Sequence, residues 1–360
     1  MTKTAQAFFR KHLSLAFYFC MSLVACKSTQ VEKAADENSF QIVVLPDTQY
    51  YTALKHGGTM EMFEEQIKWI KQNQAAEKIA YVAHVGDIVD HGRAKPEEWD
   101  RARKVLYQLE APTKGLPYGI PYGVAVGNHD QTPNGNPTDS STRVGFEQFF
   151  GRKHFEPRPY YGGAHGSSDS NDNHYDLFST GGLDFLVLYL EYNEPGDSEY
   201  NAALEKEVHD WAESILTKHA KRKAIIVSHS ILARPAGSKS NEVAGTGNNS
   251  TPSKFTPQGK SIYERFKKFP NVFMMLSGHR SGEGLRRDEF NGNVIKSFLA
   301  DYQSRTSEPG KRNGGNGLMR LMKFDLKAQT ISVRTMAPRA NGNHLWEEDE
   351  DSQFTVPLFK

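Results

Sequence analysis

Hydrophobic and polar residues alternate in runs that predict strands and helices in turn along most of the chain. Short apolar, β-branched runs predict buried strands at 41–46, 79–85, 122–126, 174–179, 184–191, 224–227 and 272–276. Between several of them, apolar residues recur every three or four positions, which predicts helices around 60–70, 99–109 and 204–215. Three further runs, 293–300, 318–325 and 330–336, read as antiparallel strands. We therefore expect an α/β fold.

Polar residues with metal-binding side chains follow five of these strands. They are Asp47, Asp87, Asn128, His229 and His279. In a sheet covered by helices, ligands gather at the carboxyl ends of the strands, so residues distant in sequence would meet there. Taken singly, each has an ordinary explanation, because aspartates cap helices and histidines hydrogen-bond within turns. Together they predict a metal site.

The donor set limits which ion would bind. Two carboxylates, one amide oxygen and two imidazoles suit Mn, Fe or Zn better than Ca or soft copper. One aspartate could bridge two cations, and a pair of metals clamps phosphoryl oxygens and generates hydroxide near neutral pH. The set therefore points toward phosphoryl chemistry.

The five strand ends resemble the sequence blocks of the calcineurin-like metallophosphoesterases, which run D-x-H, G-D-x-x-D, G-N-H-[DE], a lone His and G-H-x-H. Here the blocks read, in the same order, Asp47-Thr48-Gln49, Gly86-Asp87-Ile88-Val89-Asp90, Gly127-Asn128-His129-Asp130, His229 and Gly278-His279-Arg280-Ser281. The resemblance implies a two-layer β-sandwich core flanked by helices, and hydrolysis of phosphate esters by a metal-bound hydroxide.

The resemblance also implies a role for each residue. Asp87 would bridge two metals, one of them completed by Asn128, His229 and His279. Asp47 would belong to the other metal. His129, oriented by Asp90, would be the catalytic residue that protonates the leaving oxygen or stabilises the transition state.

Two residues depart from the family pattern, and both would belong to the same metal site. Gln49 and Ser281 stand where the family has histidines, so this metal keeps Asp47, Asp87 and, more weakly, the amide oxygen of Gln49. An all-oxygen remnant binds transition metals less tightly. We expect divalent metal ions as cofactors, one firmly held and a second weaker, drawn from Mn, Fe, Zn or Mg.

Binding of the substrate has weaker sequence signals. The family often places an arginine after the second block, where this chain has His91. Arg280 and Arg305 are the replacements that the sequence offers, and each could equally be an ordinary surface cation. We keep all three as candidate substrate-binding residues.

The N-terminus predicts a lipoprotein leader. Basic residues precede thirteen apolar or small residues, 13–25, which are too few to cross a bilayer but typical of a signal peptide. The run ends in Leu23-Val24-Ala25-Cys26, which resembles the bacterial lipobox; a generic secretory signal is the alternative. We expect a signal peptide at 1–25, a lipidated (palmitate-type) Cys26 with a tether to 39, a catalytic domain at 40–340 and a C-terminal tail at 341–360.

Composition narrows the remaining function classes. The net charge of +1 gives no basic field for nucleic acid, and two cysteines cannot build a disulfide framework. We expect a phosphodiesterase at the bacterial cell envelope, on the outer membrane or periplasmic face. It would act on a phosphate-ester small molecule or a glycan-derived substrate. The alternatives are a phosphomonoesterase and a degenerate metal-containing binding lipoprotein without catalysis.

Overall fold

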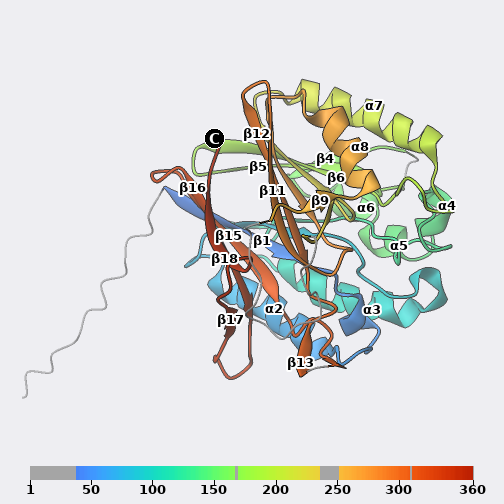
Figure 1. Cartoon of the computed structure of the whole chain (residues 1–360). Coiled ribbons are helices and arrows are strands. Elements are labelled where there is room, and N and C mark those ends of the chain that lie inside the picture. The colour runs from blue at the N-terminus through green and yellow to red at the C-terminus, as the bar shows by residue number, and fades with distance from the viewer. Residues whose placement is uncertain (1–37, 167–168, 236–250, 309, 360) are drawn as a thin grey trace, which may run out of the picture. The chain divides into compact units, whose positions relative to one another are not determined.

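The computed structural model describes residues 38–166, 169–235, 251–308 and 310–359. Cys26, the preceding leader and most of the expected tether lie outside these residues. Within them, no helix is both long and apolar enough to cross a membrane. The unit from Glu37 to Lys360 is described below (Figure 1).

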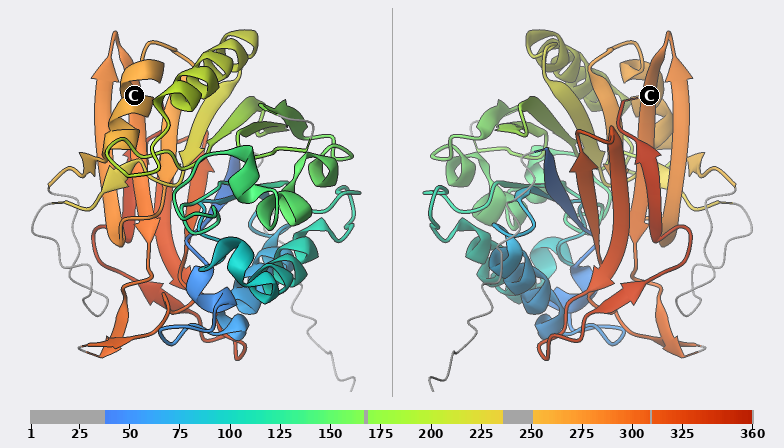
Figure 2. Two further views of the ribbon diagram at one scale, coloured as in Figure 1. Left: turned by 90° about the vertical axis from the view of Figure 1, so that its right-hand side faces the viewer. Right: turned by 90° about the vertical axis from the view of Figure 1, so that its left-hand side faces the viewer.

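Two seven-stranded sheets form the centre of this unit (Figure 2). The first has the order β17 (Leu345–Glu347), β16 (Thr330–Ala337), β15 (Met319–Asp325), β1 (Ser39–Leu45), β2 (Ile79–His84) and β3 (Tyr122–Val124), with β18 (Gln353–Pro357) also paired with β16. The second has the order β11 (Gly282–Phe290), β12 (Asn293–Asp301), β10 (Val272–Ser277), β7 (Lys223–Ser228), β6 (Leu183–Leu190), β5 (His174–Thr180) and β4 (Tyr161–Ala164).

Helices complete the architecture. The longer ones are α2 (Met60–Asn73), α3 (Pro96–Leu106), α7 (Ala202–Lys218) and α8 (Pro257–Phe266). Short ones are α1 (Gln49–Thr52), α4 (Asp139–Thr142), α5 (Phe146–Phe150) and α6 (Arg152–Phe155). Two-stranded ribbons join β8 (Leu232–Ala233) to β9 (Lys254–Phe255) and β13 (Thr306–Glu308) to β14 (Lys311–Arg312).

The sequence alternation of β1 explains why the sheets stack. Phe40, Ile42 and Val44 enter the core between the two sheets, whereas Val43 and Leu45 face a second core that includes side chains of α2 and α3. A third core lies between the second sheet and helices α7 and α8. The order is therefore helices, sheet, sheet, helices, and the predicted two-layer β-sandwich flanked by helices is confirmed.

Parallel pairing brings the candidate residues together. β1, β2 and β3 run parallel in the first sheet, and β6, β7 and β10 run parallel in the second. Their carboxyl ends therefore carry the five predicted blocks. The segment beyond 340, expected as a tail, contributes β17 and β18, which pair with β16. Helix α8 is not among the helices that the apolar periodicity predicts.

Candidate metal centre

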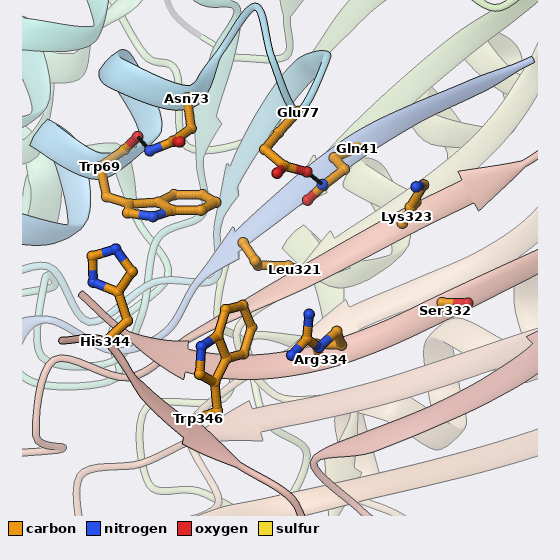
Figure 3. A pocket seen from close by; sticks show the side chains of 10 residues that line it. All are labelled: Gln41, Trp69, Asn73, Glu77, Leu321, Lys323, Ser332, Arg334, His344 and Trp346. Carbon is orange, nitrogen blue, oxygen red and sulfur yellow. Dashed lines mark hydrogen bonds between the residues drawn. The ribbon is translucent and has the colours of Figure 1, made fainter. Parts of the chain in front are cut away.

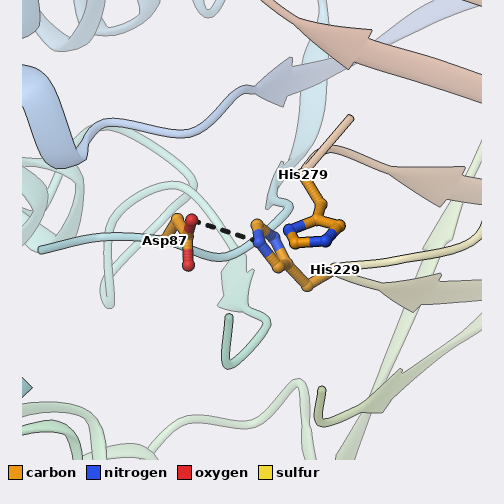
Figure 4. A group of neighbouring side chains, drawn as sticks. All are labelled: Asp87, His229 and His279. Carbon is orange, nitrogen blue, oxygen red and sulfur yellow. Dashed lines mark ion pairs between the residues drawn. The ribbon is translucent and has the colours of Figure 1, made fainter. Parts of the chain in front are cut away.

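Three predicted ligands from the two sheets meet at one point. Asp87 follows β2, His229 follows β7 and His279 follows β10, and each offers a ligand atom within 4.8 Å of the others (Figure 4). Asp87 and His279 have positive φ values of 52° and 65°, which non-glycine residues seldom adopt. Such backbone strain at a side-chain cluster is typical of functional sites.

Hydrogen bonds orient the imidazole of His229 toward this point. Its Nδ1 donates to the carbonyl oxygen of Val85 at 2.9 Å, and its Nε2 lies 3.2 Å from Asp87 Oδ2. Burial alone would lower the pKa of His229, but the carboxylates of Asp87 and Asp47 outweigh it and raise the pKa to about 10. A divalent cation would satisfy the same negative charge, with Nε2 free as its ligand.

The pKa values of the other two members favour ligand forms. Burial raises the pKa of Asp87, but His229 and His129 outweigh it, so the pKa lies well below its usual range. Burial and the charge of His229 hold the pKa of His279 well below its usual value. Asp87 is therefore a carboxylate and His279 a neutral imidazole, the forms that bind metal.

A test of the fit to a metal comes from buried polar atoms without hydrogen-bond partners. Buried polar groups in native proteins are nearly always paired, so an unpaired one indicates a missing partner such as an ion. In the described part of the chain, five of the predicted ligands each leave one such atom: Asp47 Oδ1, Gln49 Oε1, Asn128 Oδ1, His229 Nε2 and His279 Nε2. These atoms are the donors that a divalent metal would need.

Close backbone contacts explain the glycines of the blocks. A Cβ on Gly278 would lie 2.0 Å from Asp47 Oδ1, and a Cβ on Gly127 would lie 2.2 Å from Asp87 Oδ1. Only glycine lets these backbones approach the carboxylates so closely. The neighbouring block thus fixes each aspartate in place.

The residues predicted for the weaker metal, Asp47 and Gln49, have polar neighbours that the sequence reading missed. Gln303 donates its side-chain amide to Asp47 Oδ2 at 2.9 Å and accepts one from Gln49 at 3.1 Å. Asp301, at the end of β12, accepts from Ser281 Oγ at 3.3 Å and from the Gln303 backbone at 2.9 Å. Burial, and then the charge of Asp301, raises the pKa of Asp47 well above its usual value.

These contacts involve Gln49 and Ser281, the two residues that stand where the family pattern has histidines. Because the amide nitrogen of Gln49 is engaged by Gln303, its oxygen is the atom left free. Ser281 is too short to replace an imidazole, but it hydrogen-bonds the buried carboxylate of Asp301. Neither Asp301 nor Gln303 belongs to a recognisable block, so no sequence signal distinguished them.

The predicted catalytic pair also lies together. His129 Nδ1 donates to the backbone oxygen of Asp90 at 2.9 Å and lies 3.4 Å from the Asp90 carboxylate. Lys55, another residue that the sequence reading missed, pairs with that carboxylate at 2.7 Å. Burial lowers the pKa of His129, but Asp87 outweighs it and the net shift is upward. The shorter of the two contacts between the imidazole and Asp90 is the one to the backbone oxygen, so this oxygen is the main partner that orients His129.

Asp130, the last residue of the third block, has a structural role. Its Oδ1 accepts from the backbone N–H groups of Ile88 and Val89 at 2.9 and 3.1 Å, and its Oδ2 accepts from that of Gly127 at 2.8 Å. The carboxyl group thereby connects the second and third blocks. Burial raises its pKa to about 7.

The three candidate substrate-binding residues have different surroundings. His91 is 42% exposed and bonds Glu98 at 2.7 Å. The side chain of Arg280 is 46% exposed and lies 3.6 Å from Glu194. Arg305 is only 12% exposed and forms ion pairs with Glu283 and Glu347, which is a structural environment rather than an open one. His91 and Arg280 are thus the more accessible.

A separate cavity of about 370 Å³ lies against the first sheet and α2 (Figure 3). It holds none of the predicted site residues. Its lining consists of Gln41, Trp69, Asn73, Glu77, Leu321, Lys323, Ser332, Arg334, His344 and Trp346. Arg334 covers the ring of Trp346 at 3.7 Å, so one of the two indole faces is already occupied.

Comparisons with known proteins agree with the block pattern. YvnB of Bacillus subtilis (strain 168), an uncharacterized protein, is 32% identical over 321 residues, which are 87% of this chain. The chain spans only about a fifth (21%) of that protein's length.

Similar solved structures include a dimetal phosphatase from Danio rerio, at 13% identity and a TM-score of 0.49, covering 89% of this chain and 99% of that one. Another is GAP50, the anchor in the inner membrane complex of Plasmodium, at 12% identity and a TM-score of 0.49, covering 89% of each chain. The family model of the calcineurin-like phosphoesterases matches residues 40–280, more than half of the sequence. The chain therefore belongs to the calcineurin-like phosphoesterase family.

Proposed function

We propose that this protein hydrolyses phosphate esters, with a preference for phosphodiesters, at a divalent metal centre. The observation that carries the proposal is the set of five buried donor atoms on the predicted ligands, beside His129, that have no hydrogen-bond partner among the described residues. A bound divalent ion would supply Lewis-acid activation of the phosphoryl group and of water. Asp87, Asn128, His229 and His279 would hold the firm ion, and Asp47 with Gln49 the weaker one.

His129 is positioned to transfer a proton. Its backbone N–H donates to Asp87 Oδ1 at 3.0 Å, which places the residue directly beside the metal ligands. Its Nδ1 is engaged by the Asp90 backbone, so Nε2 is the nitrogen left to face the ester. In the protonated imidazole, Nε2 would give its proton to the leaving oxygen.

The preference for diesters rests on charge. A monoester near neutral pH carries about two negative charges and a diester carries one. Lys55 and Arg280, cations beside the site, are each already paired with a carboxylate, Asp90 and Glu194 respectively. His91 stands where related phosphatases often carry an arginine, and it is engaged by Glu98. This limited positive charge favours the singly charged substrate.

Anchoring at the cell envelope is part of the same proposal and rests on the sequence. The apolar run 13–25 followed by Cys26 supports a lipid-modified N-terminus on a bacterial membrane. The substrate would then be an envelope phosphate ester, such as a nucleotide-derived or glycan-derived molecule.

The test compares bis-p-nitrophenyl phosphate with p-nitrophenyl phosphate on protein of measured metal content. Mn, Zn, Mg and Fe are each titrated into the assay. We expect faster turnover of the diester, one tightly retained metal and activity that rises as a second metal is added. Faster turnover of the monoester would overturn the diester preference. One retained metal with no turnover under any condition would instead indicate a binding protein.

A further inference from the structure

A second group of carboxylates lies outside the centre described above, in the long segment between the end of β3 and the start of β5 (125–173), which is the excursion from the sheets. Asp139 begins α4, Glu147 lies in α5, and Asp172 lies two residues before the start of β5. Each offers an oxygen, and these oxygens all lie within 4.8 Å of one another. Like charges at this separation repel one another, most strongly at Asp172, which is buried, whereas Asp139 and Glu147 are partly exposed; the arrangement therefore needs an explanation.

Two of these side chains have buried oxygens that lack a hydrogen-bond partner among the described residues. Asp172 is 1% exposed, and its Oδ2 accepts from Thr142 Oγ1 at 2.6 Å. Its Oδ1 and Glu147 Oε1 are buried with no hydrogen-bond partner in the part of the chain that the structure describes. A buried carboxylate oxygen that lacks a partner is costly, and a cation is the partner that a group of three carboxylates would take.

Another carboxylate group in the structure provides a contrast. Glu283, Asp349 and Asp351 also lie within 4.8 Å, but Arg305 and Arg320 bond Glu283 there. That group is an ion-pair network with its counter-charges built in. It needs no ion.

The surroundings of Asp172 are acidic. Burial raises its pKa well above the usual value, and Glu147, Asp139 and Asp130 raise it further, against a single hydrogen bond from Thr142. The pKa of Glu147 is raised by burial and by Asp139, with Arg143 acting in the opposite direction. Burial and the neighbouring carboxylates thus disfavour the ionised form of both side chains when no cation is bound.

We propose that Asp139, Glu147 and Asp172 bind a calcium ion that fixes the excursion in place. The donors are carboxylate oxygens without an imidazole, the type that Ca²⁺ prefers, and waters would complete its six to eight ligands. The ion would connect α4, α5 and the segment leading into β5. Its charge would also offset the repulsion between Asp172 and Asp130, the residue that connects the second and third blocks.

The test uses the full-length protein, stripped with chelator and dialysed, with Ca²⁺ as the added probe. Thermal unfolding and isothermal titration calorimetry are recorded for the wild type and for Asp172→Asn, which keeps the shape of the side chain. We expect Ca²⁺ at a hundredfold excess over its Kd to raise the Tm of the wild type by about 5 °C. Asp172→Asn should lose most of that shift.

Two controls keep the result specific. Asp87→Asn removes the charge at the other centre and should retain the Ca²⁺ shift. Asp169→Asn changes a carboxylate of the same excursion that is 49% exposed and paired with Lys153, and it should also retain the shift. In chelator, Asp172→Asn should be at least as stable as the wild type, because burial and the neighbouring carboxylates disfavour a negative charge at this position.

Three outcomes would overturn the proposal. They are a wild-type Tm that does not respond to millimolar Ca²⁺, an unchanged Ca²⁺ shift in Asp172→Asn, and a shift that disappears in Asp87→Asn but persists in Asp172→Asn. A loss of stability by Asp172→Asn in chelator would assign the carboxylate a structural role instead.

Discussion

Gln303 donates its side-chain amide to Asp47 Oδ2 at 2.9 Å, although the two residues are separated by most of the domain in sequence. The same side chain accepts the amide of Gln49. One residue from the end of the second sheet thus orients both oxygen donors of the weaker metal position. A glutamine in place of the family histidine can then still present an oxygen to an ion.

Replacing Gln303 should weaken the second metal selectively. In Gln303→Leu, Gln49 and Asp47 lose the hydrogen bonds that orient them, and loss of a residue that orients metal ligands typically costs about 10- to 100-fold in metal affinity. We expect the Mn concentration for half-maximal activity to rise by that factor, while the tightly bound metal measured by mass spectrometry stays constant. Gln66→Leu, at a buried glutamine bonded to Leu318, controls for general destabilisation and should leave the Mn dependence unchanged.

Asp87→Asn should remove activity and most of the bound metal. The substitution deletes the charge that His229 and the metal position share, with little change in side-chain volume. Metal content per chain and hydrolysis of bis-p-nitrophenyl phosphate measure the effect. Asp184→Asn, at a side chain that is 60% exposed on β6, is the matched control. Retention of tight metal by Asp87→Asn would contradict its place as the shared ligand.

His129→Ala should separate catalysis from metal binding. The imidazole bonds Asp90 rather than any ligand side chain, so metal content should stay at the wild-type value. Loss of a general acid should reduce kcat by about 10²- to 10⁴-fold. A leaving group that needs no protonation, such as p-nitrophenolate, should be less affected than an alkyl ester. A fully active variant would show that His129 is not the proton donor.

The buried Asp176 of β5 predicts a pH dependence of stability. Burial raises its pKa to about 8, and its carboxyl group bonds the hydroxyl of Tyr81. Because the folded state binds a proton that the unfolded state releases near pH 4, this group stabilises the fold at low pH and loses that contribution as pH rises toward 8.

Asp176→Asn, which cannot ionise, should therefore flatten this decline. The free energy of unfolding, measured with urea, should fall between pH 5 and pH 8.5 in the wild type. In Asp176→Asn this fall should be smaller by about 2 kcal/mol or more. Asp184→Asn on the neighbouring strand should behave as the wild type. Equal declines in all three proteins would mean that Asp176 is ionised throughout.

Cys26→Ser tests the proposed anchor. The serine cannot carry a thioether-linked lipid, and without acyl chains the protein should move from the membrane to the soluble fraction of expressing bacteria. Detergent-phase partitioning of the wild type and the variant measures this. A variant that still partitions with membranes would contradict lipid attachment at this residue.

The strands and the five blocks could be predicted from sequence because short-range patterns encode them. Apolar runs such as 272–276 ended where β10 ends, and the ligand His279 followed. The blocks then met because parallel strands share an edge. The roles proposed for Asp87, Asn128 and His129 rest on that order, and the structure brings these residues together.

The remaining features depend on tertiary contacts that leave no local pattern. Gln303 and Asp301 act on residues about 20 to 256 positions away, without a motif of their own. The sequence does not predict that Arg305 forms ion pairs with Glu283 and Glu347, because these residues meet only in the tertiary structure. Helix α8 was missed because its flanking polar stretch concealed a short amphipathic segment that begins at Pro257.

The proposed metal ligands Asp47, Asp87 and Asn128 follow strands of the first sheet, and His229 and His279 follow strands of the second. Neither half of the chain contains a complete set of ligands. A fragment ending before residue 229 would carry the carboxylates without the imidazoles, and the complementary fragment the reverse. Because the residues on each side of position 229 contribute strands to both sheets, tight binding of a metal would require the two parts of the chain to have folded together.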